Sequence, residues 1–565
     1  MNKKWIGAAL LAAMLPAGFA LAAPVGSNDI NDRVNAGGEL SRMQDYLERE
    51  MVAREISEQR EKAKAEIEKQ EEEARHKSEV SFFLNRLNIE ESKVLSQDEL
   101  AIVKAKYEGR EVSLNDLYEA VDAINRIYEN RGYFTCRAFL KPQKIEGGVV
   151  FIDLAESTVG RVVLDGNRNT DKNYIRNRLP LKEGTIPSIH QLNKEQLRFN
   201  GSNDAQLRIV LKAGEAVGTT DYYITVKEPK NSSWTLFTDN MGSSLTSEYR
   251  LGLFYNNRSL SGRRNALMLG TVVSRGTAAV SAMYTHPVGR SGGKLNFSVN
   301  YNRVRQIKNT DIAKTTGHAL SFGVGYTLPL SVTETFRSEL SLDFRRQKSV
   351  TDYENKNFGT SFRLVDDTVT DFSAGLAMTQ MWDRAVFYRK HTLTFGRSTS
   401  DSLIANHSNR SKKFAFYKFS MFYQKYYGRG QNFSIRLDGQ YSFQNNLASS
   451  RLFYLGGMYS IRGYAENYIS GDSGIALNLE YGLPISKDRK VRGFVFLDYG
   501  RIFGESAESS NADRYLVSTG LGVRAQLGNN VSGTVSFGFP LKRNFDGKVD
   551  RVSLVRVNFT LSAQF

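Results

Sequence analysis

Arg462 is the most distinctive charged residue of the chain, because it stands alone among glycine, tyrosine and small residues in GGMYSIRGYAEN. It belongs to the tetrapeptide formed by Ile461, Arg462, Gly463 and Tyr464, within a long segment, 444–473, between two stretches of alternating residues. Loops of this length are uncommon unless they carry a function or are disordered. A planar guanidinium in such a loop suits a geometrically specific pair with a carboxylate.

Asp498 is one candidate partner for this arginine. In FVFLDYG, alternate residues share a face of a strand, so Phe496, Asp498 and Gly500 lie together, opposite the apolar residues between them. Arg462 can reach this carboxylate only if the loop folds back toward the strand. Glu480, on the strand that follows the loop, is a rival partner. Breaking a truly buried pair would cost roughly 3–5 kcal/mol, whereas a solvated pair would contribute little.

The other chemistry-bearing residues do not favour an enzyme. The six histidines are scattered, with no H-E-x-x-H and no serine partner in a fitting motif. The single cysteine, Cys136, excludes a disulfide framework and a cysteine-based metal site, and it suits a small packing residue. We therefore expect no catalytic residue, no metal and no cofactor.

Composition narrows the class of protein. The net charge of +16 comes without a basic cluster interleaved with aromatic residues, so we assign it to loops and a lumen and expect no nucleic-acid partner. Mean hydropathy is −0.41, and no apolar run of helix-spanning length follows the first residues, which excludes a polytopic helical membrane protein.

The first part of the chain predicts a signal peptide for export, followed by a helix. Residues 1–22 have a basic start, an apolar run and the small-x-small sequence Ala20, Leu21 and Ala22, typical of a secretory signal peptide. Residues 23–78 become helical in composition from Gly38 onward and end in a long, almost wholly charged stretch.

Two similar α/β modules are predicted next, over 79–156 and 157–230. Each reads as strand, helix, helix, strand and strand, with caps for the first pair of helices at Ser96 and Ser113. Neither module holds a nucleophile with a base, or a cluster with metal-ligand spacing.

Residues 231–565 predict a transmembrane antiparallel β-barrel. KLNFSVNYN and similar runs alternate apolar and polar residues with the length and period of membrane-spanning strands. A soluble sandwich also alternates, but here charges such as Arg436 and Asp438 occupy only the polar faces. About sixteen segments are predicted, starting near residues 233, 247, 264, 278, 293, 318, 336, 370, 390, 413, 431, 474, 491, 516, 531 and 553. The last ends at Phe565, a terminal aromatic residue that suits an outer-membrane assembly signal.

With these features the chain resembles the Omp85 superfamily, whose α/β modules are called POTRA domains. Within it, the chain most resembles the TpsB transporters of two-partner secretion, the group of filamentous-haemagglutinin and haemolysin secretion and activation proteins. The loop tip has isoleucine where valine is commoner in the family. Besides the two motifs around Arg462 and Asp498, the resemblance rests on Gly132, Tyr133, Gly166, Asn167, Leu211, Gly214, Gly218, Asp221, Asp239, Asn240, Gly242, Ser243, Tyr284, Pro287 and Gly289.

The resemblance implies a bacterial outer-membrane protein with its POTRA modules in the periplasm. It implies export of a large TpsA-type exoprotein, which the modules recognise. It also implies that the loop with Arg462 folds into the pore and is held to Asp498, and that the helix within 23–78 plugs the pore at rest. The implied partners are this exoprotein, outer-membrane lipid and, during biogenesis, the barrel assembly machinery.

Two other functions are compatible with parts of the sequence. An outer-membrane assembly or insertion factor of the Omp85 type would favour more than two modules. A plain channel or adhesive barrel would not need the modules at all.

Overall fold

The computed structural model describes residues 81–308, 313–356, 359–400, 413–503, 515–528, 530–545 and 552–565. The expected signal peptide, 1–22, and the expected plug helix and linker, 23–78, lie wholly outside the described residues. The chain forms two compact units, one with the α/β modules and one with the barrel. No helix in the described part of the chain is long and apolar enough to cross a membrane.

The first α/β module has two helices packed on short strands. Both predicted caps are confirmed, since Ser96 and Ser113 each form a capping box with the acidic residue three positions later. Cys136 is buried in the module core, as expected for a packing residue, and burial raises the pKa of its thiol to about 11. The elements are β1(Ser81–Leu84), β2(Arg86–Ile89), α2(Gln97–Tyr107), β3(Arg110–Ser113), α3(Leu114–Asn130), β4(Cys136–Phe139) and β5(Val149–Glu156).

The predicted first strand of this module is two strands, and β3 was not predicted. β1 pairs antiparallel with β3, whereas β2 pairs in parallel with β5, so the chain changes partner at Asn85. Alternation of residue types reports which face is buried and not which strand lies alongside, so the sequence pattern could not show this change.

The second module follows the predicted order of elements. Its three strands form a sheet in the order β6-β8-β7, with β6 and β8 parallel and β7 and β8 antiparallel. Tyr222 and Ile224 on the central strand are buried with Leu192 and Phe199 of the longer helix. The elements are β6(Thr158–Asp165), α4(Lys172–Arg176), α5(Ile189–Ser202), β7(Gln206–Ala213) and β8(Thr219–Lys227).

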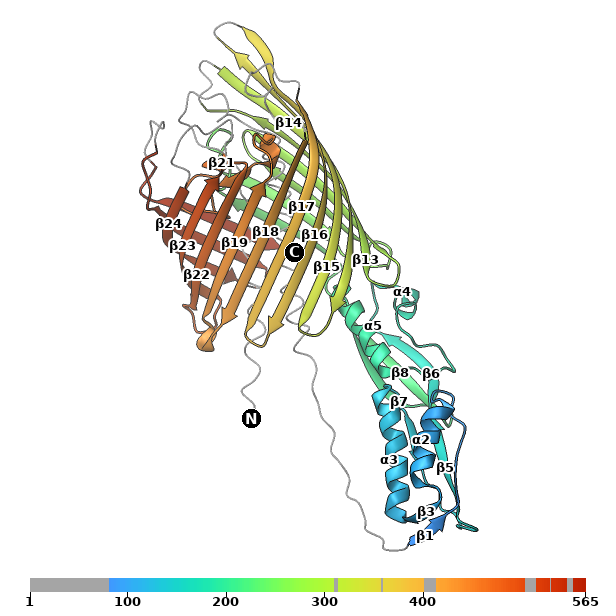
Figure 1. Cartoon of the computed structure of the whole chain (residues 1–565). Helices are drawn as coiled ribbons and strands as arrows, with labels where there is room; N and C mark the ends of the chain where they lie inside the picture. Colours follow the sequence, from blue (N-terminus) through green and yellow to red (C-terminus); the bar gives the residue numbers. More distant parts are fainter. Residues whose placement is uncertain are drawn as a thin grey trace. The chain divides into compact units, whose positions relative to one another are not determined.

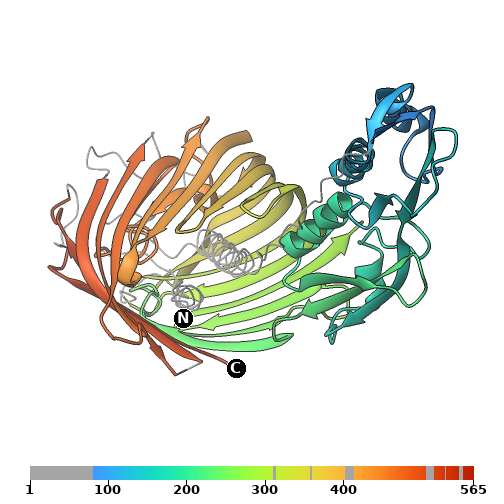
Figure 2. The ribbon, with the colours of Figure 1, turned by 90° about the horizontal axis from the view of Figure 1, so that it is seen from below.

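The remainder forms a closed barrel of sixteen antiparallel strands, which confirms the predicted fold class (Figure 1; Figure 2). All sixteen predicted segments are barrel strands, and the largest error is at the eighth, which begins at Thr360 and not near 370. The strands are β9(Ser232–Asp239), β10(Arg250–Asn257), β11(Ala266–Val273), β12(Thr277–Val288), β13(Gly293–Arg305), β14(Ala313–Val332), β15(Phe336–Asn355), β16(Thr360–Trp382), β17(Ala385–Ser400), β18(Lys413–Tyr426), β19(Asn432–Ser442), β22(Ser473–Pro484), β23(Val491–Phe503), β24(Tyr515–Leu527), β25(Val531–Pro540) and β26(Arg556–Gln564).

Apolar residues face outward and polar residues face inward along these strands. On β13, Phe297, Val299 and Tyr301 are 41–44% exposed, whereas the alternating Asn300 and Asn302 are 4% and 2% exposed. A soluble sandwich would bury the apolar face. The observed pattern is therefore that of a barrel in lipid.

The strands differ greatly in length. β9, β10 and β11 have 8 residues each, whereas β14, β15 and β16 have 20, 20 and 23. Figure 1 shows these long strands extending beyond the shorter red strands at one end of the barrel. The rim is therefore uneven at that end.

The seam between the first and last strands closes the barrel. β26 pairs with β9 over five residue pairs, from Thr560 with Asp239 to Gln564 with Thr235. The side-chain amide of Asn240 extends this seam, because it donates to the carbonyl of Val557 and accepts from the amide of Phe559, each at 2.8 Å.

Candidate functional site: a loop docked on the inner barrel wall

The long loop between β19 and β22 folds against the inner face of β22–β25. At its base a two-stranded ribbon forms from β20(Phe453–Leu455) and β21(Ile469–Gly471), next to the 3-10 turn η3(Ser449–Arg451). Its apolar residues share one core with the strands behind it. This core contains Leu455, Ile461, Tyr464, Tyr468, Ala476, Ile502 and Leu516, all 8% exposed or less.

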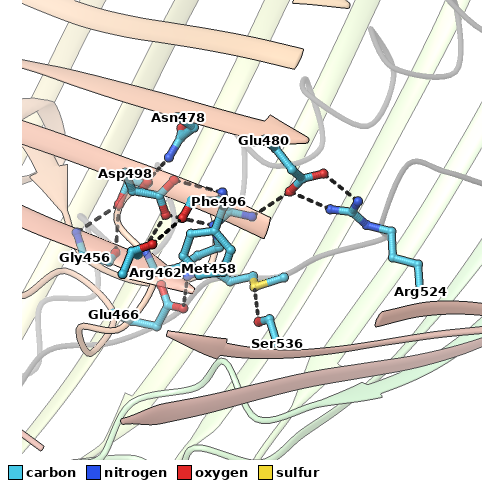
Figure 3. A network of polar contacts seen from close by, with 12 residues as sticks. Gly456, Met458, Arg462, Glu466, Asn478, Glu480, Phe496, Asp498, Arg524 and Ser536 are labelled. Atoms are coloured by element: carbon cyan, nitrogen blue, oxygen red, sulfur yellow. Dashed lines mark hydrogen bonds and ion pairs between the residues drawn. The ribbon is translucent and has the colours of Figure 1, made fainter. Parts of the chain in front are cut away.

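Arg462 makes the central contact between the loop and the wall (Figure 3). Its Nε donates to Oδ2 of Asp498 and its Nη2 donates to Oδ1, both at 2.8 Å, so the contact is bidentate. The backbone N–H of Arg462 donates to the same carboxylate at 3.0 Å. The side chain of Asp498 is 0% exposed, so this carboxylate depends on Arg462 for its charge partner.

Glu480 also pairs with Arg462, so the structure contains both of the candidate partners. Nη1 of Arg462 donates to Glu480 Oε2 at 2.7 Å, and Arg524 on β24 binds Glu480 with both terminal nitrogens, at 2.6 and 3.0 Å. The guanidinium also lies 3.6 Å from the ring centre of Phe496, a cation–π distance. Burial alone would lower the pKa of the Arg462 guanidinium, but Asp498 and Glu480 raise it above its ordinary value.

Gly500 provides space for the loop tip. A Cβ at this position would lie 2.9 Å from Ile461 Cδ1 and 2.9 Å from both methyl carbons of Leu455. Phe496, Asp498 and Gly500 are all buried on the inner face of β23, while the residues between them are exposed outward. Each residue of this motif thus contributes differently to the contact with the loop. Phe496 makes the cation–π contact, Asp498 makes the ion pair, and Gly500 has no side chain and so leaves room for the loop tip.

Gly463 and Tyr464 continue the contact onto the next two strands. Gly463 adopts φ +97°, a conformation that favours glycine, and a Cβ on the facing Gly538 would lie 2.5 Å from its amide nitrogen. The Tyr464 hydroxyl lies 2.9 Å from the carbonyl of Val517 and 2.8 Å from that of Lys542, and it is positioned to donate to them. The four residues of the tip therefore contact β22, β23, β24, β25 and Lys542, which lies just after β25.

A second buried arginine anchors the base of the loop and was not predicted from the sequence. Arg451 donates to Asp371 Oδ2 on β16 at 2.8 Å from Nε and at 2.5 Å from Nη2, and to Gln347 Oε1 on β15 at 3.1 Å. Arg345 approaches the other oxygen of Asp371 at 3.4 Å. A lone arginine in the same loop, in ASSRLFY, was the available signal.

Two further buried groups lie around the loop, and the sequence analysis predicted the contacts of neither. Glu466 is 1% exposed and accepts from the backbone N–H of Met458 at 3.0 Å, and burial raises the pKa of its carboxyl, on the loop and outside the spanning strands, to about 7. Asp239 and Arg250 form a bidentate pair at 2.8 and 3.0 Å at the outer ends of β9 and β10. The run of Asp239, Asn240, Gly242 and Ser243, which carries part of the family resemblance, was the available signal.

This arrangement is suited to holding a loop in place. Its charged groups pair with one another through charge-assisted hydrogen bonds, which are strong and yet reversible. Among the residues that the structure describes, no group of three or more His, Cys, Asp and Glu side chains is placed to hold a metal ion. Phe565 lies apart from the loop, at the seam, where its backbone pairs with Trp234 and its side chain is exposed.

A sixteen-stranded barrel, preceded by POTRA-like modules and carrying an arginine-anchored loop inside, defines an outer-membrane protein of the Omp85 type. A family model described as "POTRA domain, ShlB-type" matches residues 82–157, and one described as "Haemolysin secretion/activation protein ShlB/FhaC/HecB" matches residues 218–525. The chain belongs to this haemolysin secretion/activation family, which confirms the resemblance to the TpsB group and the outer-membrane location, with the POTRA modules in the periplasm.

Curated relatives agree with this assignment, and a solved structure shares the fold. The "Heme/hemopexin transporter protein HuxB" of Haemophilus influenzae (strain 86-028NP) is 26% identical over 499 residues, 84% of this chain and 86% of the relative. The "Outer membrane transporter CdiB" of Dickeya dadantii (strain 3937) is 23% identical over 454 residues, 76% of this chain and 78% of the relative. The structure of CdiB from Escherichia coli has a TM-score of 0.71 and 18% identity, covers 94% of this chain and 99% of its own, and shows the shared fold.

Proposed function

We propose that this chain exports a large partner exoprotein of the TpsA type across the bacterial outer membrane. The observation that carries this proposal is the loop docked inside the barrel through Arg462, in a chain of the haemolysin secretion/activation family. The proposed cargo class follows from that family, and the curated relatives are themselves named as transporters. No ATP is expected outside the cytoplasm, so folding of the cargo on the cell surface would give the transport its direction.

The loop tip acts, in this proposal, as a reversible anchor within the transport path. Asp498, Glu480 and Phe496 hold Arg462 from the wall, while Tyr464 binds backbone groups near β24 and β25. Every one of these contacts is noncovalent. The docked loop can therefore separate from the wall as the cargo passes and return afterwards.

The two modules, at 79–156 and 157–230, recognise the exoprotein in this proposal. On the first module, Phe139 and Phe151 are 38% and 55% exposed on adjacent strands, on the sheet face away from the helices. Exposed apolar side chains beside an open strand edge suit the addition of an extended peptide. Phe151→Ala should weaken binding of an N-terminal fragment of the exoprotein in a pull-down, and Tyr118→Ala, on helix α3, should not. Equal binding by both variants would show that the exoprotein is recognised by another surface.

Phe565 serves as the assembly signal read by the barrel assembly machinery. Its side chain is 57% exposed, so it contributes little to packing of the finished barrel and is available to another protein. Deletion of Phe565 should reduce the amount of chain reaching the outer membrane while leaving the thermal stability of the assembled fraction nearly unchanged. An unchanged amount of chain in the outer membrane would show that Phe565 is not the assembly signal.

The direct test of export is secretion of a large TpsA-type exoprotein into the medium, in cells with this gene intact or deleted. Loss of the exoprotein from the medium, with other outer-membrane barrels assembling normally, supports the transporter. Unchanged export together with failed assembly of other barrels would support an assembly or insertion factor instead.

A further inference from the structure

A continuous apolar row crosses the outward face of β13–β17. Strand register places Phe297 beside Val324, then Phe344, Phe372 and Phe395 in turn. All five side chains are between 42% and 52% exposed. Exposed apolar residues in one row on the outer face of a barrel mark the part of the wall in contact with acyl chains.

Four arginines follow this row on the same outward face. Arg346 and Arg397 lie two residues beyond Phe344 and Phe395, and Arg303 and Arg305 lie six and eight residues beyond the aromatic residue on β13. Because side chains alternate along a strand, an even spacing keeps them on the lipid side. All four are exposed. We name Arg303, Arg305, Arg346 and Arg397 the arginine patch.

The arginine patch lies toward the extracellular side. β9 begins directly after the periplasmic modules, so its first residue is at the periplasmic end, and each antiparallel strand then reverses direction. β13, β15 and β17 run in the same direction as β9, so their later residues lie toward the cell exterior. The patch is therefore at the boundary between the apolar band and the outer-leaflet headgroups.

These four guanidinium groups have no carboxylate partner among the described residues. None of the ion pairs found in the described part of the chain includes Arg303, Arg305, Arg346 or Arg397. Lys348, on the same face, differs because it lies 3.6 Å from Asp366. Exposed cations without protein partners at a headgroup boundary are suited to anionic lipid.

The opposite side of the barrel is different. The outer ends of β23, β24 and β25 present Phe503, Tyr515 and Phe539 to the lipid, at 39–43% exposure. The cation there, Arg501, lies 5.5 Å from the ring of Phe503. The arginine patch therefore lies on β13, β15 and β17 and is not repeated at the outer ends of β23, β24 and β25.

We propose that the arginine patch binds the phosphate groups of phosphorylated lipid headgroups in the outer leaflet. Guanidinium groups bind phosphate in a bidentate manner, and four of them can hold more than one phosphate at once. Register pairs Arg346 with Thr370 and Thr370 with Arg397, so these two cations are two strand spacings apart, about 10 Å. Bound lipid would fix β13, β15 and β17 at a defined depth in the membrane.

The test uses the purified full chain in detergent, with native mass spectrometry of added bis-phosphorylated lipid A and of the same lipid with its phosphates removed. Wild type should retain the phosphorylated lipid and lose the dephosphorylated one. A variant with Arg303→Gln, Arg305→Gln, Arg346→Gln and Arg397→Gln should bind the phosphorylated lipid at least about tenfold more weakly. Arg501→Gln should bind it as wild type does.

Three results would overturn the proposal. They are equal binding by wild type and the fourfold variant, equal binding of both lipids, and full competition by inorganic phosphate, which would indicate a site for the free anion. Heat-modifiable migration in electrophoresis checks that the fourfold variant is folded. If that variant fails to assemble, the double variant with Arg346→Gln and Arg397→Gln is measured in the same way.

Discussion

Replacing Arg462 by alanine should release the loop tip from the barrel wall. The substitution removes both guanidinium bonds to Asp498 and the bond to Glu480, together with the cation–π contact to Phe496. The two carboxylates are affected unequally. Glu480 keeps Arg524, whereas Asp498 keeps only the backbone N–H of residue 462.

The expected magnitude follows from the burial of Asp498. Its side chain is 0% exposed, so the docked loop would hold an uncompensated charge away from water. Breaking a buried pair by removing one partner costs roughly 3–5 kcal/mol. The ratio of docked to released loop should therefore fall by about two to three and a half powers of ten. Arg462→Lys keeps the charge but not the bidentate geometry, and it should lie between wild type and alanine.

Labelling of a cysteine in the loop measures this ratio. Ala465→Cys places a thiol at a half-buried position beside Tyr464, in a Cys136→Ser background that removes the natural thiol. A membrane-impermeant maleimide should label this cysteine slowly in the parent and much faster with Arg462→Ala. Arg501→Ala, on the same strand as Asp498 but facing outward, is the matched control and should label slowly.

Equal labelling rates with and without Arg462→Ala, in a barrel that is assembled, would refute this reasoning. They would mean that the apolar core around Ile461 and Tyr464 holds the loop without the ion pair. Faster labelling with unchanged export would instead show that Arg462 anchors the loop but that this anchor has no role in transport.

Three further predictions concern groups around the loop and the seam. Burial raises the pKa of the Glu466 carboxyl from 4.5 to about 7, so the docked loop holds this proton more tightly than the released loop does. Docking should therefore be strongest below pH 4.5, weaken as the pH rises to 7 and stay constant above pH 7. Glu466→Gln should flatten this pH profile in the labelling assay. Arg451→Ala should lower the thermal stability of the purified barrel less than Arg462→Ala does, because Asp371 keeps a neighbouring arginine; an equal or larger loss would contradict this. Asn240→Ala removes two hydrogen bonds of the seam and should lower the temperature of heat-modifiable unfolding by the equivalent of about 1–3 kcal/mol, and an unchanged temperature would show that the five backbone pairs suffice.

The barrel could be predicted from the sequence because its signal is local. Alternation with a period of two, as in KLNFSVNYN, depends only on which face of a strand meets lipid. The capping boxes at Ser96 and Ser113 are local in the same way. The break at Asn85 was missed because it depends on strands β3 and β5, which lie far along the chain.

The choice between two partners for Arg462 could not be made from the sequence. Register places Asp498 beside Asn478 and Glu480 beside Phe496, so the two carboxylates are diagonal neighbours on adjacent strands. One guanidinium reaches both. Only the register between β22 and β23 contains this information, and register is not visible in either strand alone.

The pair between Arg451 and Asp371 was missed for a related reason. Its members are 80 residues apart, with Arg451 in the loop and Asp371 on β16, a strand that does not adjoin the loop in sequence. A lone arginine in a long loop is a weak signal unless a matching carboxylate can be placed. Alternation can place Asp371 on the inner face of β16, but its nearness to the loop after β19 follows only from the closed barrel.

The central claim is that this chain itself transports an exoprotein through a barrel whose loop is anchored by Arg462. The most direct measurement is transport of an unfolded N-terminal exoprotein fragment into proteoliposomes that contain only the purified chain, scored by protection of the fragment from protease. The account predicts protection with wild type, none in empty vesicles, and clearly reduced protection with Arg462→Ala but not with Arg501→Ala. No protection with a correctly assembled wild-type barrel, or equal protection with Arg462→Ala, would contradict it.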